Sequence, residues 1–125
     1  MEPLLVHPNP APPGLTNVLD RMGYPWLAAA GADEATRIEP TDGWAGAIVS
    51  AEADAEGSFV TCRALRKRDV PLSPLLLIVA APQLDDLELR EDLFDDFCVA
   101  PVEPRELEAR LKHLFCGPAP APARS

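Results

Sequence analysis

The fold is decided by the run Leu75-Leu76-Leu77-Ile78-Val79-Ala80, which follows Pro71 and Pro74. A strand with one wet face alternates apolar and polar residues, whereas this run is apolar throughout. It is also far shorter than the roughly 20 residues of a membrane-spanning helix. The run therefore predicts a buried strand in the middle of a parallel sheet that helices cover on both faces.

Strand-like and helical segments alternate on either side of this run. Further strands are expected at Leu4 to His7, Tyr24 to Ala29, Trp44 to Ser50 and around Phe97 to Ala100. Helices are expected between them, from Pro13 or Gly14 to Met22, from Asp33 to Ile38, from a cap at Ser58, from Gln83 to Phe94, and from Pro104 onward. Parallel neighbours need right-handed crossovers, so the pattern predicts an α/β three-layer sandwich with sheet order 2-1-3-4-5.

Length, charge and cysteine usage limit the possible classes of protein. A chain of 125 residues is one domain with one core. Its net charge of −9 makes it a poor direct ligand for DNA, so any DNA contact is expected through a separate output domain. Cys62, Cys98 and Cys116 form no CxxC pair, which favours reduced thiols over disulfides or zinc. We expect a soluble, cytoplasmic protein with no membrane segment.

The last third of the chain carries the most specific motif. Asp95-Asp96-Phe97-Cys98-Val99-Ala100-Pro101 is followed by Pro104-Arg105-Glu106-Leu107 and then by Ala109-Arg110-Leu111. This region resembles the fifth strand and fifth helix of receiver domains in OmpR/PhoB-type response regulators, and the resemblance extends from Leu4 to Phe115. It implies the flavodoxin-like, CheY-like (βα)5 fold and a non-enzymatic, regulatory domain of a two-component system.

Receivers of this family hold Mg²⁺ with an acidic pair, accept phosphate on an aspartate, and use Ser/Thr and Lys at the next two strand ends. The matching positions here form a degenerate phosphorylation pocket of His7, Pro8, Asn9, Ser50, Val79, Ala100 and Pro101. Phosphoryl transfer to a side chain needs a carboxylate nucleophile, metal ligands and a cation, and these residues supply none of them. The resemblance therefore implies an atypical receiver that acts without phosphorylation.

Other chemistry at these positions has weaker support. Glu52 and Asp54 follow the third strand and have oxygens suited to an ion, but loop carboxylates are usually solvated, so no metal or other cofactor is expected. His7 fits a hydrogen-bonded structural role better than that of a ligand. The set His7, Ser50 and Glu52 lacks a nucleophile elbow and an oxyanion loop, which argues against a hydrolase.

Two functions from different classes remain open, and a third is a further possibility. The first is a regulatory and dimerisation module of a transcription factor. The second is a small-molecule sensor that uses the vacated pocket at the strand ends. The third is a stand-alone adaptor that binds a partner protein. Residues 1–116 form the receiver-like domain, and the Pro/Ala-rich residues 117–125 have the composition of a linker, which predicts an output domain after it.

The expected homodimer uses the fourth helix, fifth strand and fifth helix, as receivers of the OmpR/PhoB class do. In the segment from Gln83 to Phe94, we expect Leu84, Leu87 and Phe94 to face the core, and Leu89 and Leu93 to face a second copy. The resemblance implies ion pairs across the two-fold axis, formed by Asp96 with Arg110 and by Arg90 with Glu106. The alternative is that these four are ordinary surface charges.

Overall fold

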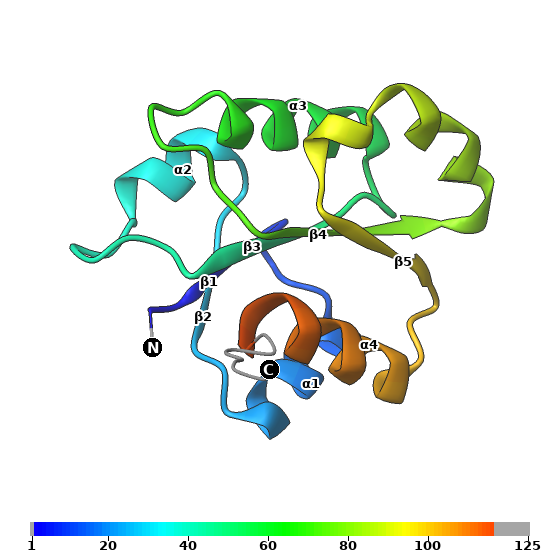
Figure 1. Ribbon diagram of the computed structural model, residues 1–125, viewed down its shortest axis with the longest axis horizontal. Coiled ribbons are helices and arrows are strands. Elements are labelled where there is room, and N and C mark those ends of the chain that lie inside the picture. The colour runs from blue at the N-terminus through cyan, green and yellow to red at the C-terminus, as the bar shows by residue number, and fades with distance from the viewer. Residues whose placement is uncertain (1, 117–125) are drawn as a thin grey trace, which may run out of the picture.

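A five-stranded parallel sheet organises the molecule, in the order β2-β1-β3-β4-β5 (Figure 1). The computed structural model describes residues 2–116, apart from the side chains of Leu89 and Cys116. The strands are β1 (Leu4–His7), β2 (Trp26–Ala28), β3 (Gly46–Ser50), β4 (Leu75–Ala80) and β5 (Asp96–Ala100). The predicted topology is confirmed. β4 has the predicted bounds, because it begins directly after Pro74 and coincides with the apolar run.

Helices cover both faces of the sheet (Figure 1). On one face lie α2 (Ala32–Arg37) and α3 (Ala55–Arg66), and on the other lie α1 (Pro13–Met22) and α4 (Pro104–Leu111). Two buried clusters result, one on each face of the sheet. Every residue of β1 and β3 is buried, as expected for strands covered on both sides. No helix within residues 2–116 is long and apolar enough to span a bilayer.

The helix ends follow local rules. Pro13 opens α1, and Gly23 ends it with a φ of 79°, a conformation that glycine adopts at little cost. Glu103 caps α4 by accepting a hydrogen bond from the Glu106 amide at 2.9 Å. The prediction that Ser58 caps α3 is wrong, because Asp54 accepts from the Gly57 amide at 3.0 Å and starts the helix earlier.

The predicted helix from Gln83 to Phe94 is also wrong. Two short 3₁₀ helices occupy this segment, η1 (Ala81–Leu89) and η2 (Glu91–Leu93). Leu84, expected in the core, is 37% exposed, whereas Leu93, expected at a dimer interface, is only 5% exposed and packs in the core beside α3. Leu87 and Leu93 are the buried leucines of this segment, one in each of the two 3₁₀ helices. A final turn, η3 (Lys112–Cys116), follows α4.

Candidate functional site

The predicted pocket residues lie at one edge of the sheet, where the carboxyl ends of the parallel strands meet. His7 is level with Val49 of β3, Ser50 is level with Ile78 of β4, and Ala80 is level with Ala100 of β5. This edge is the usual binding edge of open α/β sheets. The structure therefore brings the sequence-predicted positions together, and their individual contacts decide what the edge can do.

His7 has a structural partner. Its side chain is buried, and Nδ1 lies 3.1 Å from the carbonyl oxygen of Ala29, so Nδ1 carries the proton and donates. Burial lowers the pKa of His7 below its usual 6.5, although the Ala29 hydrogen bond and the charge of Asp54 act in the opposite direction. The expected hydrogen-bonded role is confirmed. Pro8 is half-buried and Asn9 is exposed, and neither supplies a carboxylate.

Ser50 is buried at the end of β3, at the position where the resemblance predicted a phosphoacceptor. Its Oγ lies 3.4 Å from Glu52 Oε1, while its carbonyl oxygen accepts a hydrogen bond from Ser58 Oγ at 2.9 Å. Side chains alternate along a strand, so Ser50 lies on the α1 and α4 face with Ile48, whereas His7 lies on the α3 face. Because His7 and Ser50 lie on opposite faces of the sheet, no triad forms among His7, Ser50 and Glu52.

The remaining pocket positions are apolar. Val79 is fully buried in the core on the α3 face. Ala100 and Pro101, joined by a cis peptide bond, line a cavity of about 250 Å³ together with Glu52 and apolar residues from the start of α1. Asp54 is used as the cap of α3. Within residues 2–116 no cluster of three or more His, Cys, Asp or Glu side chains is arranged to hold a metal ion.

Gln83 is a site residue that the sequence reasoning missed. Its Oε1 accepts a hydrogen bond from the Ala80 amide at 2.7 Å, and its Nε2 donates to the Ala51 carbonyl at 2.8 Å. The side chain thus ties the end of β4 to the residue after β3. No motif predicts this contact. The only available signal was that a buried strand end leaves backbone groups that need partners.

The charged residues of the predicted dimer interface have partners within the same chain. Arg110 donates from Nη1 to both carboxylate oxygens of Asp96 at 2.9 Å, and from Nε and Nη2 to Glu106 at 3.1 and 2.9 Å. These hydrogen bonds, that to Glu106 foremost, raise the pKa of Arg110. Within one chain Arg110 therefore pairs with Asp96 and Glu106, and pairing of these charges across a two-fold axis stays a prediction.

Arg90 and Leu93 of the predicted interface have contacts within the chain. The Arg90 guanidinium lies over the Phe59 ring at 4.5 Å, and Nη1 donates to the Asp86 carbonyl at 2.9 Å, while its pairing with Glu106 of a second copy stays a prediction. These contacts hold η1 against α3. Leu93 belongs to the core and is unavailable to a second copy. The side chain of Leu89 lies outside the described part of the structure.

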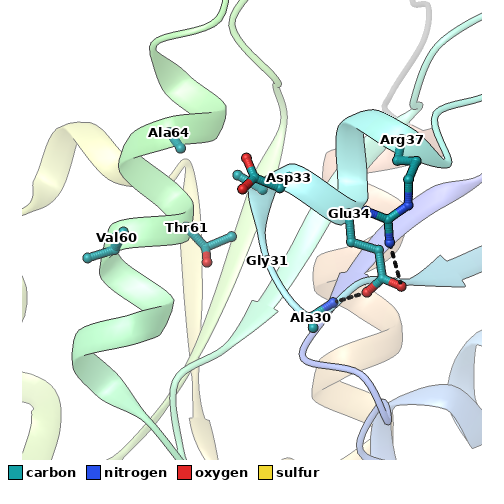
Figure 2. A pocket seen from close by; sticks show the side chains of 9 residues that line it. Ala30, Gly31, Asp33, Glu34, Arg37, Val60, Thr61 and Ala64 are labelled. Atoms are coloured by element: carbon teal, nitrogen blue, oxygen red, sulfur yellow. Dashed lines mark hydrogen bonds and ion pairs between the residues drawn. The ribbon is translucent and has the colours of Figure 1, made fainter.

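A cleft separate from the predicted pocket residues lies between α2 and α3 (Figure 2). Its volume is about 630 Å³, and small residues and the exposed Val60 line it. Figure 2 shows Asp33 on the side of α2 that faces α3, while Glu34 turns back to accept from the Ala30 amide at 2.6 Å. Glu34 also pairs with Arg37 at 3.6 Å. Nothing in the sequence predicts this cleft.

Comparison with solved structures places the fold. A candidate response regulator from Chloroflexus aurantiacus is 21% identical, with a TM-score of 0.74 over 92% of this chain and 98% of that chain. The signal receiver domain of a histidine kinase from Syntrophus aciditrophicus is 19% identical, with a TM-score of 0.74 over 100% of this chain and 98% of that chain. The receiver domain of a sensor histidine kinase from Pseudomonas aeruginosa is 17% identical, with a TM-score of 0.71 over 92% and 98%.

The chain thus has the receiver (CheY-like) fold of response regulators. No protein-family model matches the sequence, and no curated protein matches it.

Proposed function

We propose that this chain is an atypical receiver of the OmpR/PhoB type that regulates without aspartyl phosphorylation. The observation that carries the proposal is Ser50, which is buried at the phosphoacceptor position and hydrogen-bonds Glu52. A hydroxyl there needs a base, and His7 lies on the opposite face of the sheet from Ser50. Ala100, at the position of the family's lysine, has no ammonium group to meet the charge of a transferring phosphoryl group.

One neighbour offers a direct contrast. The P. aeruginosa receiver has a magnesium ion coordinated in its active site cleft. The equivalent edge here has His7 as the last residue of β1, followed by Pro8 and Asn9, which gives no acidic pair for a hard cation. This difference supports a domain that has the receiver fold but is regulated by something other than metal-dependent phosphorylation.

The test is incubation with acetyl phosphate and Mg²⁺, and separately with beryllofluoride, beside a phosphorylatable receiver as positive control. Intact mass and light scattering of this protein should stay unchanged. A stoichiometric phosphoryl adduct mapped to the strand-end residues would overturn the proposal. The variant Asp54→Asn removes the nearest aspartate after Ser50, so an adduct that it abolishes would identify Asp54 as an unforeseen acceptor.

We further propose that the domain forms a homodimer through β5 and α4, serving a transcription factor that contacts DNA through a separate domain in the cytoplasm. β5 is an edge strand, and edge strands are commonly covered by a partner. Beside it, Glu106 and Arg110 present charges that set register between copies. The net charge of −9 supports a DNA contact outside this domain.

Mixing two charge-reversal variants distinguishes pairing within a chain from pairing between chains. The wild type should be dimeric by light scattering at micromolar concentrations, and Arg110→Glu and Asp96→Arg should each weaken the dimer. The double variant in one chain should restore it, because the internal pair is rebuilt. An equimolar mixture of the single variants should not, since only cross-chain pairs would be rebuilt there. A monomeric wild type would refute the dimer. Restoration of the dimer by mixing would show that Asp96 and Arg110 pair between two chains.

A second candidate function rests on the cavity of about 250 Å³ at the strand ends. Its walls are apolar except for Glu52, and it lies at the edge where α/β sheets bind ligands. These features favour a small, largely apolar ligand over a phosphate. Chemical-shift changes confined to Leu15, Ile78 and Val102 during a fragment titration would support the sensor function.

A further inference from the structure

An apolar groove of about 370 Å³ lies on the α3 side of β5. Its floor consists of Leu84 and Leu87 from η1 with Phe94 and Phe97, and its rim carries Glu88, Glu91 and Asp95. The two phenylalanine rings meet edge to face with centroids 6.0 Å apart, so the floor is a fixed aromatic surface.

This groove is separate from the face proposed for the dimer. Alternation along β5 sends Phe97 to the α3 side and Cys98 to the α4 side. Asp96 also lies on the α4 side, where it binds Arg110. A segment in the groove and a second copy on α4 would therefore meet opposite faces of the same edge strand.

The charge around the groove restricts what can bind there. Between residues 83 and 96 the chain has seven carboxylates and one cation, Arg90. Asp95 is paired with Arg66 at 3.0 Å, and Asp96 with Arg110 at 2.9 Å. Glu88 and Glu91 have no ion-pair partner among residues 2–116. The apolar floor thus has two uncompensated carboxylates on its rim.

Like charge excludes two classes of occupant. A second copy seated through this groove would bring Glu88 and Glu91 against their own equivalents, which costs free energy. Nucleic acid and anionic lipid surfaces would be repelled for the same reason. The remaining complement to an apolar floor with an acidic rim is a segment that is both apolar and basic.

We propose that the groove binds a basic amphipathic helix of a partner protein. Large apolar side chains of that helix fill the space over Phe94 and Phe97, and its Lys or Arg residues meet Glu88 and Glu91. The volume lies within the range of about 300–1,000 Å³ that is usual for binding pockets. This inference goes beyond the proposed function and depends on neither the dimer nor the loss of phosphorylation.

The probe is a fluorescent peptide of about 18 residues made of Leu and Lys at helical spacing, long enough to form a helix on binding. It is titrated with the 125-residue protein at physiological ionic strength, and anisotropy is measured. A peptide of the same composition in shuffled order, without an apolar stripe, controls for attraction to a net charge of −9. We expect the amphipathic peptide to bind about tenfold more tightly than the shuffled one.

Two pairs of variants locate the binding. Glu88→Gln with Glu91→Gln should weaken binding of the amphipathic peptide about tenfold. The matched control, Asp85→Asn with Asp92→Asn, removes equal charge from exposed neighbours that do not line the groove and should have little effect. Leu84→Ser should weaken binding, whereas Leu27→Ser, at the opposite edge of the sheet, should not.

Equal weakening by both charge pairs, or equal affinity for both peptides, would reduce the effect to non-specific attraction and overturn the proposal. If Leu84→Ser alters the circular dichroism spectrum, the comparison of the two charge pairs decides alone, because all four positions are exposed. Arg110→Glu, which tests the dimer, should leave peptide binding unchanged. Failure of one proposal is thereby distinguishable from failure of the other.

Discussion

At the residue scale, His7 shows how a buried titratable group links stability to pH. Burial lowers the pKa of His7 in the folded protein below 6.5. As pH falls below 6.5 the unfolded chain binds a proton that the folded chain does not, so stability declines until the folded pKa is reached. His7→Gln should reduce the pH dependence of the unfolding free energy in this window by up to about 1.4 kcal/mol per pH unit.

The measurement for His7 is urea unfolding at several pH values between neutral and mildly acidic conditions. His113→Gln is the matched control, since His113 is exposed. The carboxylates contribute equally to wild type and variants, and the difference in slope isolates His7. A slope that is unchanged in His7→Gln, or changed equally in His113→Gln, would contradict the role assigned to His7.

Gly46 is a second position where one atom matters. A Cβ there would clash with the Phe115 ring and lie 2.7 Å from the carbonyl oxygen of Pro74, which is backbone and cannot swing away. Gly46→Ala should therefore destabilise the protein by about 1–3 kcal/mol through overpacking. Gly14→Ala in α1 is the control, because nothing lies within 4 Å of its added Cβ. Thermal unfolding of both variants would test this, and a neutral Gly46→Ala would show that neither Phe115 nor the Pro74 carbonyl packs tightly against this position.

At the element scale, the segment between β4 and β5 shows the limit of periodicity. Leu84, Leu87, Leu89 and Leu93 were compatible with two helical stripes, because short apolar patterns do not separate α from 3₁₀ geometry. Tertiary contacts decided the outcome. Arg90 lies over Phe59, and Leu93 packs beside α3. These two contacts fix the position of the segment against α3.

The start of α3 shows a related limit. Asp54 and Ser58 are both good capping residues, and the apolar spacing of Phe59, Cys62 and Leu65 fits either start. The structure uses Asp54 as the cap and turns the Ser58 hydroxyl onto the Ser50 carbonyl instead. That second contact joins α3 to the end of β3, so it could not be read from the local sequence.

At the scale of the whole molecule, the sheet order was predictable and the site's contacts were not. Continuous apolar runs such as β4 identify central parallel strands, and the handedness of crossovers leaves few topologies. The positions of His7, Ser50, Val79 and Ala100 at one edge followed from that topology. The bonds of Gln83 and the pairing of Arg110 within its own chain depend on distances between elements, which residue spacing does not encode.

The buried thiols provide a measurement of how the whole fold opens. Burial raises the pKa of Cys62 to about 12 and that of Cys98 to about 11, so very little of either exists as thiolate at neutral pH. Cys62 lies in α3 and Cys98 in β5, on opposite faces of the sheet. Both should resist iodoacetamide in native buffer and react in urea, at rates that follow global unfolding.

Peptide mapping by mass spectrometry keeps these two cysteines apart from Cys116, whose side chain lies outside the described structure. Rapid native labelling of Cys98 with protection of Cys62 would show that the β5 edge opens by itself. Such a result would contradict a single cooperative unit.

The occupied strand ends also bear on how this protein can change over generations. On the proposed function, a return to phosphoryl chemistry requires acidic ligands near position 7, an aspartate at 50 and an ammonium at 100, and no one of these alone transfers phosphate. Replacing His7 breaks its bond to Ala29 before any activity is gained. Each first substitution towards phosphoryl transfer is therefore disfavoured, so the loss of this chemistry is hard to reverse one mutation at a time. Mutation can explore this scaffold more freely on the surfaces that recognise its partners.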